Sequence, residues 1–467
     1  MNRRRFLKYA GTGSIAAAIA GLGYYATTQT GIRHVNPLAP NADFDYQSSY
    51  INPTSADTIC FLNKSRNPDS ADIDLAYSWY VDDRMVANTK DYSTQLSSEA
   101  IATPHKVRLS ACRAEQCGDV EKVVEVDPEN LYPPSPMKTP IKGTCYDTGI
   151  QEDNGWSSNR GISKDEMQTE IIDIVNRELG CNGIRIMGDD NDNVIRAAEI
   201  AMQGSLDTIL LSPRYCGAST NATIDKTVDL AKKAQPLYER SDKIALVIGN
   251  ELTVETSDIY PGSNRQERSD QVAVMQHDKA AQEKLEELLR SLISSCEPHF
   301  GGEKAYAAGS WEWMMPWNKL DLDILGDNHY WYGGYGKWED PDSAFFRHIA
   351  HYKKYGKPYF VTEYGLCPWE GSVDLGGNGW MHPADAKYDE DAQARGIGHY
   401  LDSFNEAGID GSFYYTLILP TPDELDNFGL LKRKVATTKE FWETGRIESL
   451  YQRNLGFYMF KSYQRVS

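Results

Sequence analysis

The sequence predicts an α/β protein in which a small all-β sandwich domain precedes a (β/α)8 TIM barrel. In the C-terminal part, short apolar runs alternate with amphipathic segments eight times over about 325 residues, and this alternation is typical of a parallel barrel. The preceding part contains several short alternating runs and no clear helical pattern, which indicates a β-sandwich.

Composition limits the classes of partner. The 467 residues are 40% hydrophobic and 25% charged, as in soluble globular proteins. The formal net charge of −19 argues against binding to nucleic acid and against docking on an anionic membrane. The 28 tyrosines and 10 tryptophans fit a carbohydrate site, because aromatic faces pack on pyranose rings while their polar tips donate hydrogen bonds.

The chain begins with a basic run, RRRFLK at positions 3–8, followed by a mildly apolar stretch. This pattern resembles the twin-arginine export signal, and the alternative is a basic start to a membrane anchor. We expect residues 1–27 to be a twin-arginine signal peptide or an uncleaved anchor. The rest of the chain would then be periplasmic, secreted or associated with the cell envelope.

A linker is expected over residues 28–45, and the β-sandwich over 46–130. The stretch at 73–81 alternates and ends at the turn signal Asp82-Asp83, and further strands are expected at 105–112 and 120–126. The run SWYVDD at 78–83 resembles immunoglobulin-like domains of the polycystic-kidney type, which often accompany secreted polysaccharide enzymes. That resemblance implies a spacer, or a module that binds glycan.

The prolines at 133, 134 and 136 predict a stiff extended linker over residues 131–140, so the barrel should occupy 141–467. Its predicted strands are 143–147, 183–187, 207–212, 244–249, 305–309, 324–328, 358–362 and 411–416. The intervening segments are predicted to be helical, most clearly at 193–203, 222–238, 279–295, 342–355 and 390–407 and after Ser163, where Glu166 completes a capping box. An open doubly wound sheet is the alternative, but GTCYD at 143–147 lacks its glycine-rich phosphate turn.

The eight cysteines include no CxxC pair, so no metal site is expected, and no cofactor motif is present. Cys112 and Cys117 are close enough for a local disulfide in an oxidising compartment.

Polar and aromatic residues collect where the predicted strands end, which is where barrel enzymes place their active sites. Strand four ends in Asn250-Glu251, and strand seven in Glu363. Cleavage of a glycosidic bond needs a proton for the leaving oxygen and, in retaining enzymes, a second carboxylate that attacks the anomeric carbon. Glu251 and Glu363 come from nearly opposite strands, so a sugar could lie between them. The neighbouring candidates for substrate binding and support are Arg185, Tyr330, His329, Trp331, Trp311 and Tyr415.

This set of residues resembles clan A of the glycoside hydrolases. The resemblance implies that Glu251 is the acid/base, that Asn250 contacts the sugar 2-hydroxyl and that Glu363 is the nucleophile. Arg185 and Tyr330 match the residues that orient the nucleophile in cellulase-like members, with His329 beside the site. The run NFGLL at 427–431 is also similar to the clan.

The clan usually has a tryptophan at the end of strand eight, whereas this chain has FYYT at 413–416, so Tyr415 would take that place. The segment LGCNGIRI at 179–186 also resembles β-1,3-glucanases, and the choice between these families stays open.

The sequence therefore predicts an exported retaining glycoside hydrolase that cleaves or transglycosylates a β-linked polysaccharide or oligosaccharide. The alternative is a catalytically inactive, carbohydrate-binding envelope protein on a glycosidase scaffold. A redox enzyme, which twin-arginine export would also fit, lacks any cofactor motif. The expected partner is a β-linked glycan, with no nucleic acid and no membrane contact beyond an N-terminal anchor. Sugar, linkage, endo or exo action and oligomeric state stay open.

Overall fold

A computed structural model describes two compact units, which divide between Pro133 and Pro134. The described residues are 42–49, 58–65, 75–95, 104–113, 116–124, 132, 134–275, 277–331, 335, 338, 340–375, 382–421, 423–433 and 451–465. The predicted export signal and all but the last residues of the first predicted linker lie outside these ranges. Within them, no helix is both long and apolar enough to cross a bilayer.

The first unit contains two antiparallel sheets. One sheet has the order β1 (Phe44–Ser49), β2 (Thr58–Asn63), β5 (Tyr92–Gln95), and the other has β4 (Arg84–Ala87), β3 (Ala76–Val81), β6 (His105–Arg113), β7 (Gln116–Val124). Trp79 of β3 is fully buried and packs edge-on against Phe44 of β1, with ring centroids 5.1 Å apart. This contact between the two sheets forms an apolar core. The immunoglobulin-like type of this unit stays a prediction.

A turn and a disulfide in this unit lie where the sequence predicts them. The turn after β3 is at Asp82 and Asp83, which both have positive φ, as short acidic side chains tolerate. Cys112 and Cys117 form a disulfide between the facing ends of β6 and β7.

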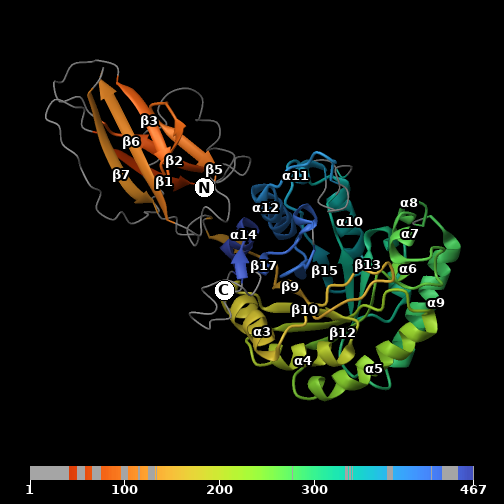
Figure 1. The fold of residues 1–467 in the computed structure, drawn as a ribbon. Helices are drawn as coiled ribbons and strands as arrows, with labels where there is room; N and C mark the ends of the chain where they lie inside the picture. The colour runs from red at the N-terminus through yellow and green to blue at the C-terminus, as the bar shows by residue number, and fades with distance from the viewer. Residues whose placement is uncertain are drawn as a thin grey trace. The chain divides into compact units, whose positions relative to one another are not determined.

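The second unit is a closed barrel of eight parallel strands, which confirms the predicted fold class (Figure 1). In chain order the strands are β9 (Ile141–Asp147), β10 (Gly183–Gly188), β11 (Thr208–Pro213), β12 (Ile244–Asn250), β13 (Lys304–Gly309), β14 (Ile324–Asn328), β15 (Tyr359–Tyr364) and β16 (Gly411–Tyr414). Each corresponds to one predicted strand. Their near-continuous apolar runs are explained by burial on both faces of the barrel wall.

Helices lie on the outside of the strands (Figure 1). They are α3 (Lys164–Gln168) with its continuation η5 (Thr169–Glu178), α4 (Asn191–Ala201), α5 (Thr220–Tyr238), α9 (Lys279–Cys296), α10 (Ala344–Lys353), α12 (Glu390–Ala407) and α14 (Leu455–Ser462). Ser163 and Glu166 form the predicted capping box of α3.

The fifth crossover differs from the prediction that every intervening segment is helical. Residues 310–323, all described, contain the short turns η6 (Ser310–Glu312) and η7 (Trp317–Lys319) and no α-helix. Pro316 cannot donate a helical hydrogen bond, and the ring of Trp317 packs against Tyr306 of β13 with centroids 6.0 Å apart. The segment therefore folds back on the barrel wall.

Shorter elements complete the rim and the C-terminal end. Four short helices are α6 (Leu252–Glu255), α7 (Arg265–Ser269), α8 (Val272–Met275) and α11 (Ser372–Leu375), with the turn η10 (Glu424–Asp426). β17 (Leu431–Arg433) pairs with β18 (Tyr451–Arg453), and β8 (Ser135–Met137) with β19 (Tyr463–Arg465). The C-terminal strand thus returns to the beginning of this unit.

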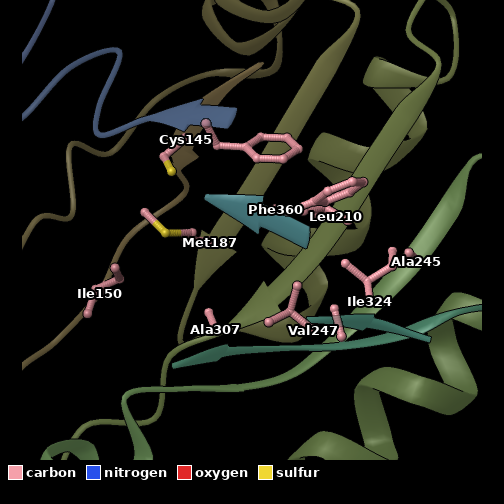
Figure 2. Close-up of a cluster of buried hydrophobic side chains, with 11 residues drawn as sticks. Cys145, Ile150, Met187, Leu210, Ala245, Val247, Ala307, Ile324 and Phe360 are labelled. Carbon is pink, nitrogen blue, oxygen red and sulfur yellow. The ribbon is translucent and has the colours of Figure 1, made fainter. Parts of the chain in front are cut away.

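The barrel interior is packed with side chains and is not a pore. Figure 2 shows this cluster, whose members come from the barrel strands and the loop after β9: Cys145, Ile150, Met187, Leu210, Ala245, Val247, Ala305, Ala307, Ile324, Phe360 and Phe413. Because this layer is apolar, the polar side chains at the carboxyl ends of the strands rest on a rigid base.

Candidate active site

Two buried glutamates lie at the carboxyl-end rim of the barrel. Glu251 directly follows β12, and Glu363 is the penultimate residue of β15; they are 6% and 5% exposed. The carboxyl ends of parallel strands meet at one rim, so the fold brings together two residues that are far apart in the sequence. A carboxylate at such depth needs hydrogen-bond donors.

Glu363 receives two such donors. Nη1 of Arg185 donates to Oε1 at 2.9 Å, and the hydroxyl of Tyr330 donates to Oε2 at 2.9 Å. Burial, and after it the charge of Glu363, raises the pKa of Tyr330 well above its usual value, so the hydroxyl keeps its proton and stays a donor. Both contacts fix the orientation of the Glu363 carboxyl group.

Arg185 is held rigidly from several strands. Its Nε and Nη2 donate to Ser212 Oγ at 3.1 and 2.9 Å, Nη2 also donates to Asn250 Oδ1 at 2.6 Å, and Nη1 reaches the carbonyl of Thr362 at 3.0 Å. The side chain has no exposed surface. The guanidinium is therefore a fixed positive group under Glu363, in the position expected from the sequence.

Glu251 has different neighbours. Nδ2 of Asn328 donates to Oε1 at 3.0 Å, and Nη2 of Arg265 donates to Oε2 at 3.1 Å. The backbone of Glu251 is in the left-handed region, with φ of +43°, where the chain turns from β12 into α6. This strained conformation directs the residue into the rim, and strain of this kind is often found at active sites.

Asn250 links the two glutamates through its side chain. Its Oδ1 accepts hydrogen bonds from Arg185 and, at 3.0 Å, from Asn328, while its Nδ2 donates to Glu255 Oε1 at 2.8 Å. Glu255 is buried and paired with Arg214, whose Nε lies 2.6 Å away. Three of the predicted neighbours, Asn250, Arg185 and Tyr330, thus lie in one continuous hydrogen-bond network with the two glutamates.

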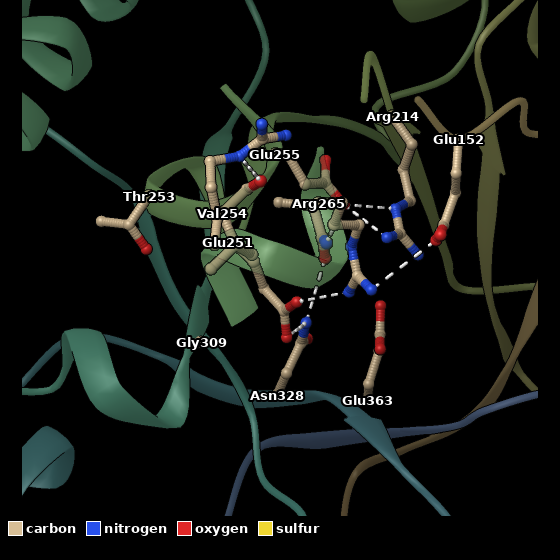
Figure 3. Close-up of polar contacts among 12 residues, drawn as sticks. Glu152, Arg214, Glu251, Thr253, Val254, Glu255, Arg265, Gly309, Asn328 and Glu363 are labelled. Carbon is tan, nitrogen blue, oxygen red and sulfur yellow. Dashed lines mark hydrogen bonds and ion pairs between the residues drawn. The ribbon is translucent and has the colours of Figure 1, made fainter. Parts of the chain in front are cut away.

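Arg265 brings a positive charge to the rim from the loop after β12. Figure 3 shows its guanidinium between Glu152 and Glu251, joined to each by a dashed line, with the Glu363 carboxyl group facing the same region. The distances to the two carboxylates are 3.6 Å for Glu152 and 3.1 Å for Glu251.

The structure does not bring the side chains of His329 and Trp331 to the carboxyl groups of the two glutamates. The ring of His329 is fully buried beside Asp327, with Nδ1 3.2 Å from Oδ2, and burial lowers its pKa. Trp331 is 1% exposed and stacks on Trp338 with centroids 4.0 Å apart. Successive residues of an extended chain point to opposite sides, so of these three side chains Tyr330 alone contacts the Glu363 carboxylate. His329 contacts Glu363 only through the backbone, where its N–H donates to the Glu363 carbonyl at 2.8 Å.

Trp311 and Tyr415 pack mainly against apolar side chains near the rim. Nε1 of Trp311 donates to Thr253 Oγ1 at 2.8 Å, and the ring packs on an apolar cluster that includes Val254. Tyr415 is partly buried and packs edge-on against Phe428, with centroids 5.7 Å apart. Trp311 therefore supports the loop after β12, and Tyr415 lies between the barrel core and the loop after β16.

Several residues of this network were not among the predicted site residues. They are Asn328, Ser212, Arg214, Glu255, Glu152 and Arg265. Asn328 is the last residue of a predicted strand, so the same reasoning that located Glu251 and Glu363 could have identified it. Arg265 lies in a long irregular segment, residues 252–278, in which no local pattern marks it.

Two groups of side chains have atoms close enough to hold a metal ion, counting the described residues alone. In the first, Asp327, His329 and His348 are largely buried, and Asp327 Oδ2 already contacts His348 Nε2 at 2.8 Å. The second consists of His382, Asp423 and Asp426, at least partly exposed. Neither group includes Glu251 or Glu363.

Comparison with known proteins finds neither a family model nor a curated protein that matches this chain. Among solved structures, a GH113 β-1,4-mannanase is similar over 70% of this chain and 98% of its own, with 14% identity and a TM-score of 0.46. A glycoside hydrolase family 5 enzyme from Prevotella bryantii B14 is similar over 71% and 99%, with 13% identity and a TM-score of 0.42. A β-glucuronidase from Faecalibacterium prausnitzii is similar over 86% and 63%, with 11% identity and a TM-score of 0.39. Similarity of this degree does not by itself assign an activity.

Proposed function

We propose that this chain is a retaining glycoside hydrolase that cleaves, or transfers from, a β-linked polysaccharide or oligosaccharide by double displacement. One observation carries the proposal: two buried glutamates share one rim, and each is held by its own donors. Arg185 and Tyr330 hold Glu363, while Asn328 and Arg265 contact Glu251. Retaining glycosidases use such a carboxyl pair, one as nucleophile and one as acid/base.

In the first step, a carboxylate oxygen of Glu363 attacks the anomeric carbon and forms a glycosyl ester. The bond from that carbon to the leaving oxygen breaks, and Glu251 supplies the proton that the leaving sugar takes. Arg185 and Tyr330 keep the attacking carboxyl group in one orientation, which lowers the entropic cost of reaching the transition state.

In the second step, the carboxylate of Glu251 accepts a proton from water as the water oxygen attacks the anomeric carbon. The ester bond to Glu363 breaks, and the sugar leaves with its original configuration because the carbon has been inverted twice. A sugar hydroxyl in place of water gives transglycosylation by the same step.

We also propose that the protein is exported by the twin-arginine route and acts in the periplasm, in the cell envelope or outside the cell. The run RRRFLK at 3–8 and the apolar stretch after it support this. Fractionation of cells that express wild type or Arg3→Lys/Arg4→Lys chains tests it, and export that does not change in the double variant would contradict it.

The competing function is a catalytically inactive carbohydrate-binding protein. The presence of both glutamates, each with donors, favours the enzyme. The decisive experiment incubates wild type and Glu363→Ala with β-glucans, mannans and xylans and measures reducing ends and product sizes. Cleavage by the wild type alone supports the enzyme. Binding without cleavage by either protein would favour the inactive form.

A further inference from the structure

Arg265 contacts the carboxyl group of the proposed acid/base. It donates to Oε2 of Glu251, while Asn328 donates to Oε1, so both oxygens of Glu251 accept hydrogen bonds. An oxygen that faces the N–H of Arg265 cannot at the same time donate a proton to a leaving group along that direction. Acid catalysis from that side of Oε2 therefore requires Arg265 to move to another acceptor when the substrate binds.

The contacts of Arg265 are the weakest of the rim arginines. Its side chain is 15% exposed, against 0% for Arg185 and 5% for Arg214, and its second contact, to Glu152, is long at 3.6 Å. Its Nε is buried and has no hydrogen-bond partner. If the guanidinium turns away from Glu251, its Nε and Nη2 can together donate to a pair of oxygens, which is the geometry that arginine offers to oxyanions.

A second arginine lies in the same charged group. Arg214, at the end of β11, pairs with Glu255, and its Nη2 has no hydrogen-bond partner of good geometry. Burial raises the pKa of Glu255, which the charges of Arg214 and then Arg265 act to lower. Both guanidinium groups thus act on one buried carboxylate, and an anion that replaced Glu251 as the partner of Arg265 would lie near two positive charges.

The backbone under Arg265 is anchored firmly. Its N–H donates to Asp153 Oδ1 at 2.7 Å, and Asp153 Oδ2 accepts from Nη2 of Arg268 at 2.8 Å. Arg268 is fully buried and also donates to the carbonyl of Val254 at 2.6 Å. Gly262 permits this packing, because a Cβ there would lie 2.6 Å from Arg268 Cγ. These contacts thus hold the backbone of Arg265 at the rim, while the Nε of its guanidinium has no acceptor.

We propose that Arg265, assisted by Arg214, binds an acidic group on a sugar next to the cleaved bond, so that the substrate is an anionic β-linked glycan. The acidic group is an oxyanion, either the carboxylate of a uronic acid or a sulfate ester. By drawing Arg265 from Glu251, it frees Oε2 to act on the leaving oxygen. The net charge of −19 opposes a polyanion at a distance, but salt screens such repulsion beyond about 8 Å, so contact charges decide binding.

The inference rests on the proposed glycosidase function. Pairs of acidic and neutral substrates with the same linkage test the anionic site separately from the glycosidase activity. The substrates are β-1,3- and β-1,4-linked oligoglucuronates and oligomannuronates, the neutral gluco- and manno-oligosaccharides of the same linkages, and sulfated forms of the neutral set. The proteins are wild type, Arg265→Gln, Arg265→Lys and the control Arg290→Gln. Arg290 is an arginine of α9 that pairs with Glu286 on the surface.

We expect wild type to prefer an acidic substrate over its neutral counterpart. In Arg265→Gln that ratio of kcat/KM should fall by about 10- to 100-fold, chiefly through KM, since one charge-assisted contact is lost. The ratio for Arg265→Lys should lie between those of wild type and Arg265→Gln, and the ratio for Arg290→Gln should equal that of wild type. A preference for sulfated substrates would identify the oxyanion as sulfate. Equal kcat/KM on acidic and neutral substrates, or a ratio that Arg265→Gln leaves unchanged, would overturn the inference while the glycosidase function stands.

Binding measurements test the anionic site even if none of these substrates is cleaved. Calorimetry with Glu363→Gln and with Glu363→Gln/Arg265→Gln measures affinity for the same oligosaccharides without turnover. Tighter binding of acidic ligands that depends on Arg265 would support the anionic site even if the glycosidase function fails. Absence of such binding would overturn the inference. Thermal unfolding of Arg265→Gln close to that of wild type excludes a folding defect as the cause.

Discussion

The hydroxyl of Tyr330 lies 2.9 Å from Oε2 of Glu363, and the two residues come from neighbouring strands of the barrel, one two residues after the end of β14 and one in β15. With Arg185 on the other oxygen, Glu363 is held at both ends of its carboxyl group. Glu251 instead contacts Arg265, the first residue of the short helix α7. From this asymmetry we propose that Glu363 attacks and that Glu251 transfers the proton, and the following predictions test these roles.

Glu363→Gln should lower kcat by about 10³-fold or more, because the amide cannot form the glycosyl ester. Arg185 keeps Ser212, Asn250 and Thr362 as acceptors, so the barrel should remain folded. Steady-state kinetics and circular dichroism check both points. Glu283→Gln, an exposed change on α9, serves as the control, and activity near the wild-type value in Glu363→Gln would refute the nucleophile assignment.

Glu251→Gln should affect substrates according to their leaving group. Natural glycosides need a proton for a basic leaving oxygen and should slow by about 10²- to 10⁴-fold, whereas activated aryl glycosides need little acid assistance in the first step. The measurement is kcat/KM on matched glycosides with leaving groups of different pKa. A uniform loss across the series would contradict the acid role.

Tyr330→Phe should reduce kcat by about 10- to 100-fold, since it removes a hydrogen bond to a buried carboxylate. The raised pKa of Tyr330 means that its hydroxyl does not ionise at neutral or mildly alkaline pH. The alkaline limb of the wild-type pH–rate profile should therefore persist in the variant. Loss of that limb together with the hydroxyl would show that Tyr330 itself titrates.

Glu312 should make stability depend on pH. Burial raises its pKa from 4.5 to about 7, against the opposing hydrogen bonds from Thr253, Tyr306 and Gly309. The folded state then binds a proton more tightly than the unfolded state, so this contribution is complete below about pH 4.5 and is lost as pH rises through about 7.

Urea unfolding between pH 4.5 and 7.5 measures this effect. We expect a slope of at most about 1.4 kcal/mol per pH unit from this one proton. Glu312→Gln should flatten the dependence in this window, and the exposed Glu287→Gln should leave it unchanged. A wild-type slope retained in Glu312→Gln would assign the titration to another group.

The strands were predictable because burial on both faces leaves an unmistakable apolar run in each of them. The ends of those runs located Glu251 and Glu363. The crossover after β13 was not predictable in the same way, because Trp317 and its neighbours are as apolar as a helix face and adopt short turns through contacts with Tyr306. His329 and Trp331 illustrate a second limit: a strand-end position does not tell which side of the chain faces the rim.

The sequence by itself determined the barrel and the position of the two glutamates at its rim. The carboxyl ends of parallel strands lie at the same end of a barrel, independent of the conformation of the loops. The tertiary structure alone decided which side chains contact those glutamates. Arg265 reaches Glu251 because its backbone is bound to Asp153, 112 positions earlier in the chain. No local pattern records a contact of that range, because it depends on how two loops pack against each other after the barrel has closed.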